Sequence, residues 1–289
     1  MTELHETFSD DFKALWEPES QMQAIWENIE VLYQGIKDFA QEQAILQLGY
    51  RPLPEIESDM ASKSKPMEFL YLETIRLLWT KILLRTLLKV IDGMQLVFYS
   101  ANTRNAYGCA LGARSVLEHI ALLQYFGNQA PWLTQSMVDL QAAIPFTKAL
   151  FNLGLGSRFN WDELLKGNIR QMVSRGDWER PKDERIPAIA QLIEGLETAL
   201  QNEGKLQYKN ELKFLYGVLC DVVHPSWGGD FIYAPNMYRE MQPSRENIER
   251  FKVSAVMFCG SLHGLMAHLV RLHERLTERM PDLILREHK

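Results

Sequence analysis

Helical spacing of apolar residues runs along nearly the whole chain, and this spacing constrains the fold more than any other feature. The first clear example has apolar side chains at steps of three and four residues: Ile25, Ile29, Leu32, Ile36 and Phe39. Such steps place side chains on one face of an α-helix. We find no alternating strand pattern of useful length and no internal repeat. The sequence therefore predicts an all-α bundle of about eight helices.

Capping residues, glycines and prolines predict where these helices begin and end. The predicted helices cover residues 20–48, 67–91, 102–126, 131–153 with a kink at Pro145, 160–173, 187–203, 207–223 and 244–280. The segments 49–66, 174–186 and 225–243 are predicted loops, the last of them rich in aromatic residues. We divide the chain into an N-terminal helix and loop over residues 1–66, loosely attached, and a helical bundle domain over residues 67–289.

The charge of the chain argues against general nucleic-acid binding. Its 289 residues carry 31 Lys and Arg against 37 Asp and Glu, a formal net charge of −6. Binding to nucleic acid without sequence preference depends on neutralising phosphates with cations. A local basic site for RNA stays open. Lys81, Arg85 and Lys89 form one basic stripe, which we interpret as a solvated helix face, the alternative being a surface for RNA or an acidic partner.

The cysteines and the N-terminus indicate a reducing compartment. The three cysteines are odd in number and far apart in sequence, which argues against a disulfide framework. No Cys or His spacing indicates zinc, and no motif indicates another metal or a cofactor. The N-terminus lacks an apolar signal segment. The most apolar stretch, residues 77–99, is interrupted by Lys81, Arg85, Lys89 and Asp92, so we expect no membrane span and a cytoplasmic location.

A charged pair interrupts the predicted helix over residues 102–126. Arg114 and Glu118 lie one turn apart among Ala, Leu, Val and Ile. Buried charge is costly unless it is paired, so we expect the two to form a polar cluster. One interpretation is a functional pocket, and the other is an internal ion pair that fixes helix register. Gly108 and Gly112 share one face of this helix and predict close approach of a neighbouring helix.

A second polar element ends the predicted helix over residues 207–223. His224 lies at its C-terminus, where backbone carbonyls and Asp221 favour the imidazolium that suits a general acid. Tyr216 and Cys220 share its face at steps of four residues. The structural alternative is a C-capping histidine whose ring satisfies loop carbonyls. Polar groups on apolar helices need partners, so we expect His224 to lie near Arg114.

These two elements together carry a resemblance. Arg114-Ser-x-x-Glu118, followed about 100 residues later by Tyr216-x-x-Leu-x-x-x-Val-His224-Pro-Ser, resembles a widespread family of uncharacterised bacterial helical proteins over roughly residues 70–230. That family implies serine where this chain has Cys220. More distantly, Arg114-x-x-x-x-His119 resembles the Arg-x(4–6)-His pattern of HEPN ribonucleases, which are small helical bundles. This second resemblance implies RNA as the substrate and a role in antiviral defence.

Two functions follow as hypotheses. The first is a metal-independent ribonuclease whose site residues are Arg114, Glu118, His119, Tyr216 and His224. A histidine would move protons at the ribose, and Arg114 would stabilise the charge of the phosphorane. The second is a non-catalytic interaction or regulatory protein in which the same cluster serves the fold. Gly260 and Gly264 indicate tight helix packing, for which we expect a homodimer or another protein partner.

Overall fold

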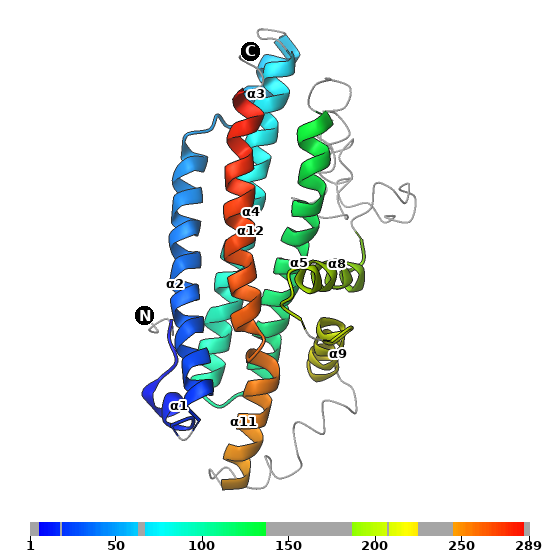
Figure 1. Ribbon diagram of the computed structural model, residues 1–289. Coiled ribbons are helices and arrows are strands. Elements are labelled where there is room, and N and C mark those ends of the chain that lie inside the picture. The colour runs from blue at the N-terminus through cyan, green and yellow to red at the C-terminus, as the bar shows by residue number, and fades with distance from the viewer. Residues whose placement is uncertain are drawn as a thin grey trace. The chain divides into compact units, whose positions relative to one another are not determined.

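The computed structural model describes residues 6–17, 19–62, 67–136, 187–206, 208–224 and 245–285. The helices in these ranges are α1 (Asp10–Ala14), α2 (Ser20–Leu48), α3 (Leu53–Ser62), α4 (Met67–Asn102), α5 (Ala106–Ser136), α8 (Ile189–Asn202), α9 (Glu211–Val223), α11 (Arg245–Cys259) and α12 (Leu262–Leu285) (Figure 1). No strand occurs in the described ranges, which confirms the predicted all-α multi-helix fold.

Contacts divide the chain into two compact units. The first comprises residues 1–40, 86–125 and 189–273, and the second comprises residues 41–85, 126–188 and 274–289. The long helices α2, α4, α5 and α12 each contribute residues to both units. The division after residue 66 that we expected from the sequence stays a prediction.

Three predicted helices are confirmed within about two to four residues at each end. They are α2, which is followed by Gly49, α8, and α9, which is followed by His224. Gly204 follows α8 with a φ of 67°, a left-handed conformation that favours glycine. The predicted helix over 160–173, most of the one over 131–153, and the aromatic loop over 225–243 lie outside the described residues.

Two predicted boundaries are wrong at proline or glycine positions. The segment 49–66, expected to be a loop, contains α3, because Pro52 and Pro54 lie before or within its first turn, where proline costs no helical hydrogen bond. The single helix expected over 244–280 is instead two helices, α11 and α12, separated at Gly260 and Ser261.

The helix predicted over residues 67–91, with Gly93 beyond its end, continues to Asn102 as α4, so that Gly93 lies inside it. The structure gives this glycine a packing role. A Cβ built at Gly112 of α5 would lie 2.7 Å from the carbonyl oxygen of Gly93 and 2.7 Å from a methyl carbon of Val97. The two backbones therefore approach too closely for side chains, as the small residues of α5 predicted. One turn along α5, a Cβ at Gly108 would collide with the side chain of Ser100.

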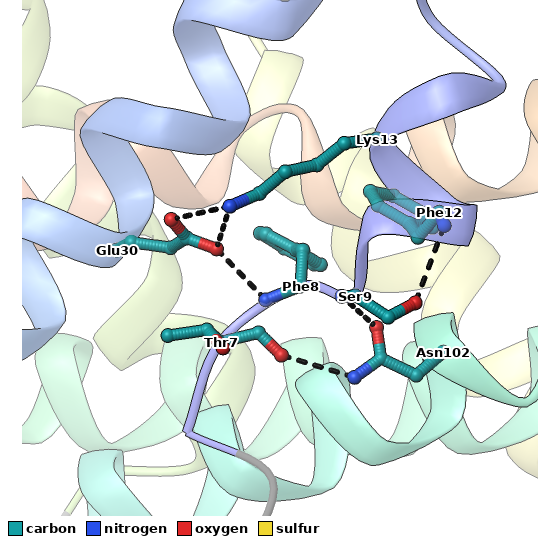
Figure 2. Close-up of polar contacts among 7 residues, drawn as sticks. All are labelled: Thr7, Phe8, Ser9, Phe12, Lys13, Glu30 and Asn102. Atoms are coloured by element: carbon teal, nitrogen blue, oxygen red, sulfur yellow. Dashed lines mark hydrogen bonds and ion pairs between the residues drawn. The ribbon is translucent and has the colours of Figure 1, made fainter.

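The N-terminal segment is held by side chains of two helices in the first unit (Figure 2). The amide of Asn102 accepts a hydrogen bond from the backbone N–H of Ser9 at 2.7 Å and donates one to the carbonyl of Thr7 at 3.0 Å. The carboxylate of Glu30 accepts from the backbone N–H of Phe8 at 2.8 Å and pairs with Lys13 at 3.0 Å. The backbone on both sides of Phe8 is thus fixed.

Aromatic packing completes this attachment. Phe8 packs edge-on against Trp26 and Phe98, and Phe12 packs edge-on against Trp26 and Phe251. Phe8, Phe12 and Trp26 are all buried, with at most 3% of their surface exposed. The expectation of a loosely attached N-terminal helix is therefore wrong. That helix is α2, and its Trp26 together with the segment before it supplies part of the core of the first unit.

One described stretch is long and apolar enough to cross a membrane by length and composition alone. It covers Ile248–Glu278, and 44% of its most apolar window is buried inside the protein. A core helix of a globular protein passes the same test. Gly260 and Ser261 also interrupt the helical structure of this stretch.

Candidate functional site

The candidate site lies in the first unit and begins with the ion pair on α5. Nε of Arg114 donates to Oε1 of Glu118 at 2.8 Å, one helical turn away. The glycine crossing with α4 holds this part of α5, because Gly112 precedes Arg114 by two residues. The sequence prediction that these two side chains form a pair is confirmed.

Tyr216 of α9 joins the pair from a distant part of the chain. Its hydroxyl donates to Oε1 of Glu118 at 3.2 Å. Its ring also faces the guanidinium of Arg114, with the central carbon 5.7 Å from the ring centroid. Tyr216 therefore contacts both charges, through a hydrogen bond to the carboxylate and a cation–π contact to the guanidinium.

His224 completes the cluster, as expected. Its Nε2 lies 3.2 Å from Nη1 of Arg114, although 110 positions separate the two residues. His224 follows α9 in an extended conformation, with φ −88° and ψ 150°, and its N–H donates to the carbonyl of Cys220. The proline at position 225 favours this conformation, because the residue before proline avoids the helical region.

The roles of the two nitrogens in this contact depend on the tautomer of the imidazole. A guanidinium has only donors, so Nε2 of His224 must accept, and a neutral ring then carries its proton on Nδ1. The expectation of an imidazolium at the helix C-terminus stays a prediction. In the tautomer that accepts from Arg114, Nε2 of His224 presents a lone pair, which suits a base.

The cluster is less buried than the sequence indicated. The side chain of Arg114 is 20% exposed and that of Glu118 is 26% exposed, and His224 is exposed. The neighbouring helix face also carries the exposed apolar residues Tyr107 and Leu111. The expected burial of the pair is therefore only partial, because α5 buries one face and leaves this one within reach of solvent.

The electrostatics stabilise the charged form of Arg114 and the neutral form of Tyr216. Partial burial lowers the pKa of Arg114, but the hydrogen bond and charge of Glu118 outweigh it, so that the pKa rises. Burial, a hydrogen bond with Cys220 and the charge of Glu118 raise the pKa of Tyr216 well above its usual value. Tyr216 is therefore a hydrogen-bond donor at neutral pH and no source of phenolate.

His119 does not belong to this cluster. Its Nδ1 lies 2.7 Å from the carbonyl oxygen of Ser115 on the same helix. A step of five residues places it at a different angle round α5 from Arg114. The structure thus brings Arg114 together with Glu118, Tyr216 and His224, and it ties His119 to its own backbone.

A second polar cluster was not expected from the sequence. His268 of α12 is fully buried, with Nε2 at 2.7 Å from the amide oxygen of Gln124 and Nδ1 at 3.4 Å from Glu203. Arg271 also pairs with Glu203. Burial acts to raise the pKa of this carboxyl, but the interactions with His268 and Arg271 outweigh it, so that the pKa is lowered. Within the described ranges no group of three or more His, Cys, Asp or Glu side chains could hold a metal ion.

Comparisons with protein-family models, curated proteins and solved structures found no significant match to this chain. The function must therefore be argued from the cluster itself. Its chemistry combines a cation, an imidazole nitrogen beside that cation, and a phenol donor, all within reach of solvent. Such a set can bind an oxyanion and remove a proton from a hydroxyl group beside it.

Proposed function

We propose that this protein is a metal-independent, HEPN-like ribonuclease of the cytoplasm. The observation that carries the proposal is the contact between Arg114 and His224, which places a fixed cation beside a neutral imidazole. Cleavage of RNA at the ribose needs a base for the 2′-hydroxyl and a cation for the charge that develops on phosphorus. Both groups are present, and neither needs a metal.

Arg114 has further N–H donors with which it can bind a phosphate. A guanidinium carries five N–H donors, and those of Arg114 make hydrogen bonds to Glu118 and His224 within the described residues. The remaining N–H groups of the fork match the oxygens of a phosphate. The pair with Glu118 keeps the guanidinium in one orientation, so that less freedom is lost when a phosphate binds.

The reaction then follows from the resting contact. A phosphate that accepts from the remaining N–H groups of Arg114 moves the guanidinium toward itself and releases the lone pair of Nε2. His224 removes the proton of the 2′-hydroxyl, the 2′-oxygen attacks phosphorus, and the bond to the 5′-oxygen breaks. The leaving 5′-oxygen takes a proton from solvent, His224 returns its proton to solvent, and the products are a 2′,3′-cyclic phosphate and a 5′-hydroxyl. Arg114 stabilises the phosphorane between them.

Incubation with total RNA in the presence of EDTA tests the proposal. We expect the wild type to cleave RNA, and Arg114→Ala and His224→Ala to abolish cleavage while circular dichroism shows a retained fold. His263→Ala is the matched control, because His263 is a half-buried histidine of α12 with no shown contact to the cluster. Intact RNA with the wild type, or cleavage that survives both site variants, would contradict the proposal.

His119→Ala distinguishes two versions of the ribonuclease. If the Arg114-x-x-x-x-His119 pattern carries catalysis, this variant is inactive. The hydrogen bond between His119 and Ser115 favours the other version, in which His224 is the base and His119→Ala keeps most of its activity.

The alternative function is a non-catalytic interaction or regulatory protein. One observation favours it: Arg114 already has three partners in Glu118, Tyr216 and His224, as a cluster that fixes the register of α5 against α9 would need. On this hypothesis Arg114→Ala and His224→Ala lower stability, and the purified wild type leaves RNA intact at every concentration tested.

A further inference from the structure

The start of α9 lacks a cap of its own. Its N-cap residue, Asn210, has a left-handed backbone with φ 66° and ψ 20°, and its side chain makes no capping hydrogen bond. An N-cap side chain ordinarily accepts from one of the first free N–H groups of its helix. Acceptors from elsewhere in the protein therefore have to satisfy these N–H groups. Their identity matters for the site, because α9 carries Tyr216 and is followed by His224.

The carboxylate of Glu197 on α8 caps the start of α9 instead. Glu197 is 5% exposed. One of its oxygens accepts from the backbone N–H of Asn210, and the other accepts from the backbone N–H of Lys213 at 3.2 Å. Gln201 donates to the first oxygen at 3.4 Å. In a capping box two side chains share these tasks, one for the N-cap N–H and one for the N–H three residues later. Here a single carboxylate from another helix performs both.

This arrangement fixes the position of α9 along its own axis. The buried residues Leu212, Leu219 and Val222 hold one face of the helix, but apolar contacts permit sliding more readily than directed hydrogen bonds do. The carboxylate also interacts favourably with the positive end of the helix dipole. Tyr216 follows Lys213 by one turn, so a shift at the capped end reaches the site through a rigid helix.

We propose that Glu197 is a positioning residue for the candidate site. By capping α9 from α8 it places Tyr216 against Glu118 and His224 against Arg114. The structural part of this inference stands by itself, and its effect on catalysis rests on the ribonuclease proposed above.

The test compares Glu197→Ala and Glu197→Gln with Glu194→Ala. Glu194 is a matched control on the same helix, because its carboxylate pairs with the side chain of Lys213 at 2.6 Å and both side chains are more than half exposed. The main readout is the ¹⁵N NMR spectrum of the imidazole of His224 in folded protein, assigned with His224→Gln. In the wild type and in Glu194→Ala we expect the proton of the neutral ring on Nδ1, because Nε2 accepts from Arg114.

In Glu197→Ala we expect His224 to lose this tautomer and to show the mixture of a free imidazole. Glu197→Gln should fall between the two, since its amide oxygen still accepts from one of the two N–H groups. If RNA cleavage is present, kcat should fall by about 100-fold in Glu197→Ala with a smaller change in KM, since a misplaced base lowers the chemical step.

A folded Glu197→Ala protein whose His224 keeps the wild-type tautomer would overturn the inference, whether or not the protein cleaves RNA. Unfolding of both Glu197 variants would also overturn it, because the residue would then support the fold as a whole. An inactive wild type in which Glu197→Ala still releases His224 would refute only the proposed ribonuclease.

Discussion

Nη1 of Arg114 lies 3.2 Å from Nε2 of His224, a contact between α5 and the C-terminal end of α9. It joins two charged or ionisable groups that would repel each other if both carried a proton. In a hydrogen bond between them the guanidinium donates, so Nε2 of His224 accepts and the ring proton lies on Nδ1. Removing Arg114 takes away this donor, and we expect the tautomer of the imidazole to change while the fold is retained.

The ion pair on α5 should contribute moderately to stability. The 20% and 26% exposure of Arg114 and Glu118 indicates a coupling of about 1 kcal/mol, and not the roughly 3–5 kcal/mol that removal of one fully buried partner costs. Urea unfolding of Arg114→Ala, Glu118→Ala and the double variant measures this coupling. Lys89 and Asp92, 50% and 62% exposed, form a control pair whose coupling should be near zero. Equal couplings for the two pairs would contradict the expectation.

The crossing of α4 and α5 should not tolerate a methyl group. Gly112→Ala places its Cβ 2.7 Å from the carbonyl oxygen of Gly93, and we expect a loss of about 2–3 kcal/mol in the free energy of unfolding. Gly195→Ala in α8 is the control, because a Cβ there meets nothing within 4 Å. It should stabilise the protein by about 1 kcal/mol through helix propensity. Thermal unfolding of both variants checks the two signs, and a neutral Gly112→Ala would exclude the close crossing.

The fold class and the crossing of α4 and α5 show what the sequence can predict. The apolar spacing predicted the fold class, and the small residues of α5 predicted a close helix contact. The same pattern could not show that Gly93 continues α4, because a glycine that ends a helix and one that admits a neighbouring backbone look alike in sequence. Only the partner helix distinguishes them.

The sequence also predicted the candidate site only in part. Arg114, Glu118, Tyr216 and His224 stood out as polar residues on apolar helices, and the need for partners predicted their association. The imidazolium expected from the helix end at His224 stays a prediction. The sequence did not predict the role of Glu197. A glutamate on an amphipathic helix ordinarily faces solvent, and the backbone N–H groups to which it binds leave no pattern in the sequence.

His273 should make the protein sensitive to acid. Burial lowers its pKa to about 4 from the ordinary histidine value of 6.5, and its ring stacks on Phe39 at 4.6 Å between centroids. As pH falls, His273 of the unfolded chain takes up its proton before His273 of the folded protein does. The stability that depends on neutral His273 is therefore fully present above pH 6.5 and is lost as pH falls toward 4. The loss should be about 3 kcal/mol.

Urea midpoints between pH 4 and pH 7 measure this loss. His273→Leu keeps an apolar side chain against Phe39 and removes the titrating group, so its midpoint should change less with pH than that of the wild type. Parallel pH profiles for the two proteins would show that His273 is not the group responsible.

The three cysteines should differ sharply in reactivity. A hydrogen bond with Cys109 and complete burial raise the pKa of Cys259, and both of these thiols are buried. Cys220 is half-buried beside Tyr216 and Arg114. A thiol reagent such as DTNB should therefore modify one cysteine in the folded chain and three in denaturant. Cys220→Ser should abolish the fast reaction, and two or more fast thiols in the wild type would contradict the structure.

The aromatic cluster round the N-terminal segment has a consequence for synthesis of the chain. Phe12 packs against Phe251, so residues of α1 find part of their packing only when α11, more than 200 positions later, has been made. At about 5–20 residues per second this interval lasts for tens of seconds at the slower rate. Phe8, Phe12 and Trp26 stay incompletely covered on the nascent chain throughout it. The first unit is therefore completed late, when residues made early and residues made much later pack together.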